Sequence, residues 1–158
     1  AFIQLIKLTR QTSSLFLELL NKSVYKFKCA ILQDLGHLLY LCEKEELIIT
    51  LLLVNNEPVG FYVFRDPYIT YDNNKSIEMI ASYNDNTTNE IFALGFLCSI
   101  KHLNIKTKRL LMTDSGHNNI ILNIILKKYK IITVLMGSFY FYNYATYPLM
   151  SYDVLSLV

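Results

Sequence analysis

The sequence predicts an α/β (α+β) domain in which a mixed sheet is flanked by helices. Three observations support this prediction. Two segments with helical spacing come early, two apolar runs separated by a turn follow them, and segments of helix and strand character then alternate. The 158 residues have the length of one domain, so we expect residues 1–158 to form a single unit.

The first half of the chain is expected to hold a strand, two helices and a hairpin. Phe2–Leu8 is a short apolar run typical of an opening strand. Threonine and serine side chains can cap a helix over 13–28, and a second helix is expected over Leu32–Cys42. Leu47–Val54 and Val59–Phe64 flank an Asn-Asn-Glu-Pro turn, which predicts a hairpin.

The second half is expected to alternate. Ser76–Tyr83 is a strand candidate, and helices are expected over 88–103 and 118–128 on either side of a strand at Lys108–Met112. Three further strands are expected at Ile131–Met136, Ser138–Tyr144 and Val154–Val158. The central sheet should therefore have about six or seven strands.

Composition supports a folded core and excludes several classes of protein. Apolar residues make up 53% of the chain and charged residues 18%, which excludes intrinsic disorder. A net charge of +2 argues against a dedicated nucleic-acid binder, which needs clustered cations. The uncharged run near the end alternates and contains Asn143 and Pro148, so we expect paired strands there and no membrane span.

The three cysteines, Cys29, Cys42 and Cys98, lie in apolar contexts. An odd number in a chain of this length argues against a disulfide scaffold, so we expect free thiols in a reducing compartment. No basic-then-apolar signal segment opens the sequence. These features together predict a cytoplasmic protein.

Three local motifs invite a chemical interpretation that their spacing does not support. Cys29, His37 and Cys42 match no common zinc pattern and lack a fourth ligand, so we expect no metal site. Ser-Gly-His at 115–117 lacks the Gly-x-Ser-x-Gly elbow of a nucleophilic serine, so we expect a loop. The five glycines are scattered, and neither later helix begins with a glycine-rich phosphate loop.

The run Phe-Tyr-Phe-Tyr-Asn-Tyr at 139–144 is the least ordinary local feature. In a strand, residues 139, 141 and 143 face one side, and 140, 142 and 144 face the other. One face can pack in the core while tyrosines on the other line a peptide groove. The alternative, which stays open, is a strand buried on both sides.

Several segments, taken in chain order, match the pattern of one known family. They are Leu17–Lys22, Tyr25–Ala30, His37, Val59–Phe64, Ser82–Asn84, Leu111–Asn118, Phe139–Tyr144 and Val154–Val158. Together they resemble the C-terminal domain of N-myristoyltransferase, in order and over nearly the whole chain. Its Asn-Ala-Leu-Asp-x-x-x-Asn segment is matched with Asp114 and Asn118 kept, whereas the opening asparagine becomes Leu111. The family's acidic Gly-Asp-Gly turn becomes Val-Leu-Met-Gly at 134–137.

The resemblance implies the fold of acyl-CoA N-acyltransferases, the GNAT fold, in the half that mostly holds the acceptor peptide. It also implies that no cofactor is bound by this chain alone, and that acyl-CoA (myristoyl-CoA) is bound once a partner half completes the enzyme. The expected partners are a protein or peptide with an N-terminal glycine and a second GNAT-like half or larger assembly. The family uses its C-terminal carboxylate as the base, a role that Val158 would take here.

The expected peptide groove combines these arguments. Its residues would be His37, Tyr62, Tyr83, Asn118, Tyr140 and Tyr142. Three functions stay open: transfer of a fatty acyl group from acyl-CoA to an N-terminal glycine with a partner half, an inactive peptide- or protein-binding subunit, and a small N-acetyltransferase. The missing pyrophosphate loop disfavours the third.

Overall fold

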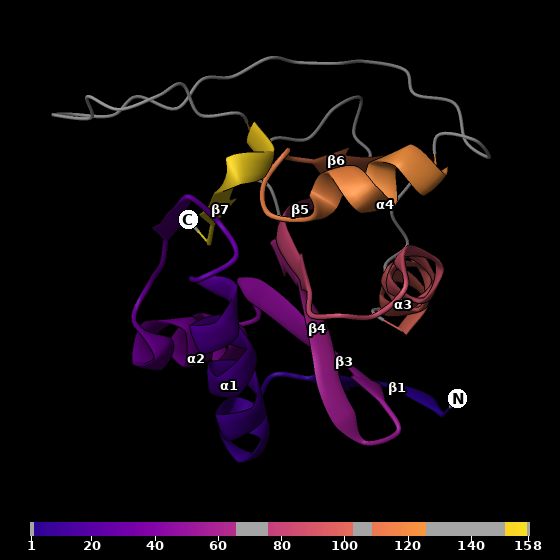
Figure 1. Ribbon diagram of the computed structural model, residues 1–158. Helices are drawn as coiled ribbons and strands as arrows, with labels where there is room; N and C mark the ends of the chain where they lie inside the picture. Colours follow the sequence, from indigo (N-terminus) through magenta and orange to yellow (C-terminus); the bar gives the residue numbers. More distant parts are fainter. Residues whose placement is uncertain (1, 66–75, 103–108, 126–150, 158) are drawn as a thin grey trace, which may run out of the picture.

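The computed structural model describes residues 2–65, 76–102, 109–125 and 151–157. Figure 1 shows two early helices, a meander of strands, and then helices alternating with strands. The elements are β1 Ile3–Lys7, α1 Ser13–Ser23, β2 Cys29–Ile31, α2 Leu35–Glu43, β3 Leu47–Val54, β4 Glu57–Arg65, β5 Ser76–Asn84, α3 Asn89–His102, β6 Arg109–Met112, α4 Asn118–Ile125 and β7 Val154–Ser156.

The main sheet is mixed, as the sequence predicts. Its strand order is β1-β3-β4-β5-β6, with antiparallel pairs from β1 to β5 and a parallel pair between β5 and β6. A second, two-stranded sheet joins β2 to β7 in parallel. The described residues thus divide seven strands between two sheets, and the strands expected at 131–136 and 138–144 lie outside them.

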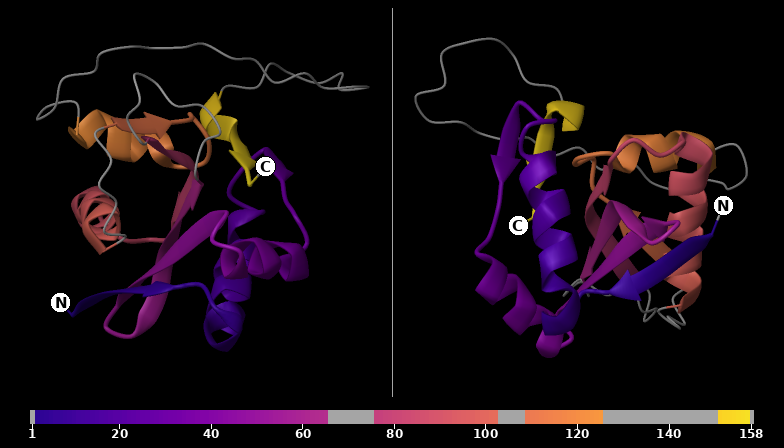
Figure 2. Two further views of the ribbon diagram at one scale, coloured as in Figure 1. Left: turned by 180° about the vertical axis from the view of Figure 1, so that it is seen from behind. Right: turned by 60° about the horizontal axis from the view of Figure 1, so that its bottom comes forward.

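Helices cover both faces of the main sheet, which the two views of Figure 2 show. α1 and α2 lie on one face and α3 and α4 on the other. Each face has its own apolar core, with Phe16, Leu19 and Phe61 in the first and Phe64, Phe92 and Phe96 in the second, all at most 1% exposed. The α/β prediction is therefore confirmed.

A β-bulge in β5 changes which face its side chains meet. Val63 pairs with Ala81 but Phe64 pairs with Met79, so Ile80 is an extra residue without its own partner on β4. Before the bulge, Ile77 and Met79 pack in the α3 core; after it, Ala81 and Tyr83 pack in the α1 core.

One local prediction was wrong, and one strand was missed. The helix expected over 13–28 ends at Ser23, and two turns follow, in which the N–H groups of Tyr25 and Lys26 donate to the carbonyls of Lys22 and Ser23. Val24, Tyr25 and Phe27 favour helix weakly, and the N–H of Lys28 donates to the Asp153 carbonyl instead. This tie leads directly into β2, a strand that the sequence analysis did not predict.

The hairpin and the second helix follow the expected local rules, with shifted ends. Asn55 and Asn56 have φ of 51° and 65°, which is the geometry of a two-residue hairpin turn, so β4 starts earlier than expected, at Glu57. α2 begins at Leu35 because the Asp34 carboxylate caps it by accepting from the His37 N–H at 3.3 Å.

Candidate active site at the fork between β5 and β6

The strongest candidate for a functional site is the fork between β5 and β6. The two strands pair in parallel from Ser76 opposite Arg109 to Met79 opposite Met112, and the pairing then stops. In α/β sheets, ligands bind beyond the carboxyl ends of parallel strands, where neighbouring strands separate. Here the bulge at Ile80 lies at the point of separation, and α3 follows the carboxyl end of β5.

Thr113, the first residue after β6, bonds to β5 at the base of the fork. Its N–H donates to the Met79 carbonyl at 3.2 Å, and its hydroxyl donates to the Ile80 carbonyl at 2.8 Å. Two successive carbonyls of β5 point towards this residue because the bulge interrupts the usual alternation. Thr113 thereby satisfies main-chain groups that β6 no longer reaches.

Asn118 completes the base of the fork from the start of α4. Its side chain is 1% exposed, and its Nδ2 donates to the Thr113 carbonyl at 2.6 Å and to the Met79 carbonyl at 3.4 Å. Its Oδ1 accepts from the Ser82 hydroxyl at 2.5 Å. Every polar atom of this amide is thus used inside the protein, as a buried amide requires.

His117 bonds to the second half of β5. Its N–H donates to the Ser82 carbonyl at 2.9 Å, and its Nδ1 accepts from the Asn84 N–H at 2.8 Å. Because Nδ1 is an acceptor, the neutral ring carries its hydrogen on Nε2. Burial and the nearby Lys26 ammonium lower the pKa of His117 to about 4. The ring is therefore uncharged at neutral pH.

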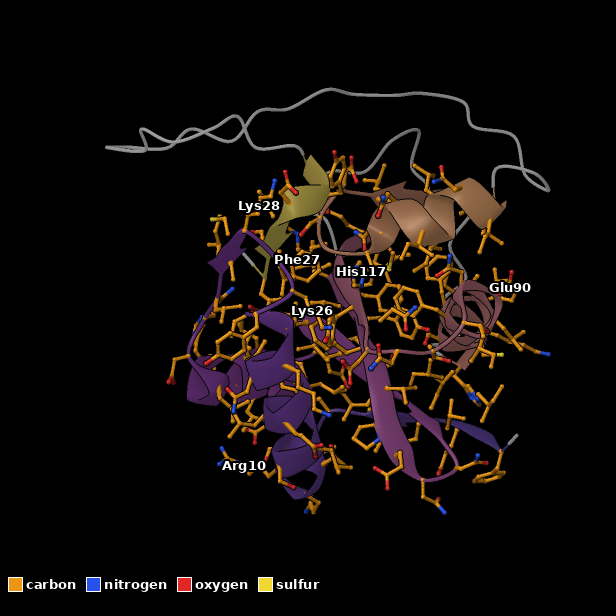
Figure 3. All side chains as sticks on the ribbon, viewed as in Figure 1. Arg10, Lys26, Phe27, Lys28, Glu90 and His117 are labelled. Carbon is orange, nitrogen blue, oxygen red and sulfur yellow. The ribbon has the colours of Figure 1, made fainter. Side chains whose placement is uncertain are left out.

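Aromatic rings from β5, α3 and the segment after α1 surround His117. Its ring stacks on Tyr83 with centroids 5.6 Å apart and lies 4.9 Å from Phe27, while Phe92 of α3 meets it edge-on at 6.5 Å. Figure 3 labels His117 beside Phe27 and Lys26, the residues that follow α1. The irregular segment after α1 therefore helps to fix the imidazole.

Gly116 allows the loop to approach β5 closely. Its φ is +58°, and a Cβ at this position would collide with the Ser82 carbonyl oxygen. The Gly116 N–H donates to the Val154 carbonyl at 2.8 Å, so the loop is held by β7 as well as by β5.

At the far end of the fork, Tyr83, Asp85 and Lys22 form a polar chain. The Tyr83 hydroxyl donates to Asp85 Oδ1 at 2.7 Å, and Lys22 Nζ lies 3.5 Å from Asp85 Oδ2. Burial and then the Asp85 carboxylate raise the pKa of Tyr83. The tyrosine therefore stays protonated and acts as a donor.

The structure does not bring the predicted groove residues together. Tyr62 and Tyr83 are both fully buried, but Tyr62 pairs with Ser82 and faces α3, whereas Tyr83 pairs with Phe61 and faces α1. The Tyr62 hydroxyl donates to the Phe92 carbonyl at 2.6 Å. One groove cannot be lined by both tyrosines, because neighbouring positions of paired strands point to opposite faces.

The other predicted residues lie apart or outside the described ranges. His37 is exposed on α2, where its ring stacks on Tyr40, and Asn118 lies buried at the base of the fork. Tyr140, Tyr142 and Val158 fall outside the described residues, so their roles in peptide binding and as the base stay predictions.

The sequence analysis weighed Ser115-Gly116-His117 as a nucleophile and expected a loop, and a loop is what the structure has. It missed His117 as a partner of β5. The signal available in the sequence was the glycine before the histidine, which permits the close approach of a loop to a strand.

Other candidate chemistry is weaker. All three cysteines are free and partly buried, and burial raises the pKa of the Cys42 thiol, so this thiol is not activated as a nucleophile. Within the described ranges, no three metal-binding side chains gather at one point. None of the helices described is long and apolar enough to cross a bilayer.

No protein-family model matches the sequence, and no curated protein matches it. Solved structures do match by fold. An aminoglycoside acetyltransferase, meta-AAC0020 from an uncultured soil metagenomic sample, in complex with sisomicin, superimposes with a TM-score of 0.67 at 14% identity. The match covers 89% of this chain and 96% of that one.

Two further neighbours have the same fold. The ribosomal-protein-alanine N-acetyltransferase of Brucella melitensis biovar Abortus 2308 has a TM-score of 0.62 at 12% identity, over 89% of this chain and 100% of that one. The aminoglycoside N-acetyltransferase AAC(6')-Iy, in complex with CoA, has a TM-score of 0.61 at 8% identity, over 88% and 99%. The chain therefore has the GNAT fold that the sequence resemblance implied. Nothing in these matches bears on the myristoyl-specific part of that resemblance.

In the described conformation, the main-chain groups at the fork are not free to bind an acyl-CoA. The main-chain groups of Met79, Ile80, Ser82 and Asn84 that face it already bond to residues 113–118. At the start of α3, the Asn84 side chain holds the turn by bonding both main-chain groups of Thr87, and Glu90 places a carboxylate in the first helical turn. A carboxylate there competes with a pyrophosphate for the same positive helix end.

Proposed function

We propose that this protein acts in N-acyl transfer, moving an acyl group from a CoA thioester to an amine nitrogen. The observation that supports this most is the extent of the fold match: the chain spans 96% and 100% of two acetyltransferase structures. The match thus runs over nearly the whole length of those structures. The proposal therefore favours a single-chain N-acetyltransferase over a half-enzyme.

The acceptor in this proposal is an amine. The neighbours are named for aminoglycosides and for an alanine of a ribosomal protein, and both acceptors offer a nitrogen that can attack a thioester carbonyl. In such a reaction the amine must lose a proton, so a base near its nitrogen is required. The Val158 carboxylate is our candidate for this base if the chain ends there.

The finer form of the proposal follows the sequence resemblance. There the acyl group is myristoyl, the acceptor is an N-terminal glycine, and a second GNAT-like half holds the acyl-CoA. The edge of β5 that faces the fork is bonded by residues 113–118. This is consistent with the finer form, because a chain that only holds the acceptor needs no binding site for the cofactor.

The filled edge also favours a second candidate function. A GNAT-fold chain that cannot take up acyl-CoA would act as a peptide- or protein-binding subunit without catalysis. The small N-acetyltransferase and the binding subunit differ in one respect that can be measured: only the first one releases CoA.

An acyl-transfer assay separates these functions. The purified chain is incubated with acetyl-CoA or myristoyl-CoA and with sisomicin, a peptide that begins with glycine, or a peptide that begins with alanine. Thiol release and product mass are measured. We expect acetyl transfer to at least one acceptor, with peptides whose N-terminus is already acetylated as the blocked control. Release of CoA only from myristoyl-CoA would support the myristoyl specificity of the finer form and would reject its requirement for a second half. No transfer with either donor would reject catalysis by this chain.

A further inference from the structure

The second half of β5 presents main-chain groups to the fork in the spacing of an open strand edge. Such an edge binds extended molecules that carry amides, because an amide supplies one N–H and one C=O, as a strand residue does. In this chain the edge is already paired, with residues 113–118, although these residues form no strand.

His117 reproduces the bonds of a strand residue in a parallel pair. In a parallel ladder, one residue donates its N–H to the carbonyl before its partner and accepts, through its C=O, from the N–H after that partner. His117 donates to the Ser82 carbonyl and accepts from the Asn84 N–H, on either side of Tyr83. The acceptor is ring Nδ1 in place of a carbonyl oxygen.

Side chains from both faces of the sheet hold the His117 ring against this edge. The imidazole stacks on Tyr83 and contacts Phe27 and Phe92, which lie on the two faces of the sheet. The residues just before it are fixed by β7, since Gly116 N–H donates to Val154 and Ser115 Oγ accepts from the Ser156 N–H at 2.8 Å. The imidazole is thus a built part of the fork.

We infer that His117 holds the place on the β5 edge that an amide-bearing arm, such as the pantetheine of an acyl-CoA, would need, so that the histidine and this ligand exclude each other. The inference rests on the proposed function for the identity of the ligand. It assigns to His117 a role in access to the fork, and makes the Asn84 N–H the group for which the two compete.

The test compares three proteins by calorimetry with pantetheine and with acetyl-CoA. His117→Ala removes the ring and frees the Asn84 N–H. His117→Asn is the matched control, because its Oδ1 can stand near the position of Nδ1 and keep the acceptor. We expect His117→Ala to bind pantetheine at least about tenfold more tightly than the wild type and His117→Asn, since no internal hydrogen bond has to be broken.

A second reading uses the ¹⁵N spectrum of the wild type. Pantetheine at saturation should shift the Asn84 amide signal. The ¹⁵N chemical shifts of the His117 ring should change to those of an imidazole whose Nδ1 accepts no hydrogen bond. If His117→Ala folds only when imidazole is added to refill the space, competition between imidazole and pantetheine is measured in that variant. Displacement of imidazole would support the inference.

Three results would overturn it: equal pantetheine affinity in wild type and His117→Ala, binding that leaves the Asn84 and His117 signals unchanged, or no binding to any of the proteins. None of these results decides the proposed function, because an acyl-CoA bound elsewhere would still give transfer in the separate assay. Conversely, tighter pantetheine binding by His117→Ala with no acyl transfer would keep the inference and reject catalysis.

Discussion

The two halves of β5 use the same backbone groups with different partners. From Ser76 to Met79 the strand pairs with β6 in a regular parallel ladder. From Ala81 to Asn84 the same edge is bonded by a loop, through a ring nitrogen and a main-chain N–H of one residue, His117. The first half needs only strand-forming residues, whereas the second half depends on a few particular side chains.

This difference predicts where the fold tolerates substitution. A ladder of main-chain bonds survives most changes of side chain, because no side chain takes part in it. The loop that pairs with the second half has no such tolerance, since the Gly116 conformation, the His117 ring and the Asn118 amide each satisfy a specific group of β5. The first three of the following experiments each test one of these dependences, and the fourth compares a tyrosine of β4 with a tyrosine of β5.

The largest effect is expected for Gly116→Ala. The alanine would have to adopt the left-handed backbone conformation of Gly116, and its Cβ would collide with the Ser82 carbonyl oxygen. The loop would therefore have to move away from β5. We expect a loss of about 4 kcal/mol in the free energy of unfolding, the sum of backbone strain and steric overlap. Urea denaturation at pH 7.5 measures it.

Gly36→Ala is the matched control for that substitution. Gly36 lies in α2, and a Cβ there meets only Asp34 Oδ2, at 3.0 Å, which is the flexible end of the capping side chain. The gain in helix propensity is offset by any shift of this cap, so stability should change by less than about 1 kcal/mol. An equal loss in both variants would show that the contact of Gly116 with β5 has no special cost.

The pH dependence of stability comes next. The neutral His117 is favoured in the folded protein, whereas in the unfolded chain it takes up a proton near its ordinary pKa of 6.5. Its contribution is complete above about pH 6.5 and is lost as the pH falls towards about 4, by at most about 3 kcal/mol.

Denaturation curves of the wild type and His117→Asn at pH 7.5, 6, 5 and 4 isolate this contribution, because the carboxylates titrate in both proteins. The variant should be less stable at pH 7.5 but should lose less stability on acidification. Parallel losses in the two proteins would contradict the buried acceptor role of Nδ1.

Asn118→Ala should cost about 2 kcal/mol. It leaves the Thr113 carbonyl without its 2.6 Å donor and the buried Ser82 hydroxyl without its acceptor. The adjacent Asn119→Ala, a half-buried position on the same helix, is the control and should change stability by less than about 0.5 kcal/mol. Thermal unfolding followed by circular dichroism compares the two.

The smallest expected effect separates the two tyrosines that the groove prediction grouped together. Tyr62→Phe removes a fully buried hydroxyl that donates to the Phe92 carbonyl, at a cost of about 1 kcal/mol. Tyr83→Phe removes a donor to Asp85, which keeps its ion pair with Lys22, so about half of that loss is expected. A larger loss for Tyr83→Phe would mean that the bond to the Asp85 carboxylate, which is partly exposed, stabilises the fold more than the fully buried bond of Tyr62 does.

Hydrophobic periodicity and capping residues predicted most of the fold. The runs Leu47–Val54 and Ser76–Tyr83 became β3 and most of β5 because apolar, β-branched residues in short blocks favour buried strands. Asp34 marked the start of α2 through a local hydrogen bond, which its carboxylate accepts from the His37 N–H. The asparagines at 118–119 marked the start of α4 by residue type. These are effects of near neighbours in the chain, which a sequence displays directly.

The site was not predictable in the same way, because it depends on register. The sequence places Tyr62 and Tyr83 on strands but does not show that Tyr62 pairs with Ser82, which puts the two rings on opposite faces. The end of α1 at Ser23 depends similarly on a distant partner, the Asp153 carbonyl that accepts from Lys28. Contacts between residues far apart in the chain decided both outcomes.

The extra residue at Ile80 shifts the alternation of side chains along β5 by one position. Upstream of it, odd-numbered side chains meet the α3 core, and downstream they meet the α1 core. Deleting this one residue would restore strict alternation and leave Ser82 and Tyr83 on their present faces, because Val63 and Phe64 of β4 would keep Ala81 and Met79 as partners. It would remove the second of two successive carbonyls at the base of the fork, the Ile80 carbonyl that accepts from the Thr113 hydroxyl. Homologous chains that lack the insertion would then need another acceptor for the residue at position 113, and a length difference of one position in an alignment would mark that change.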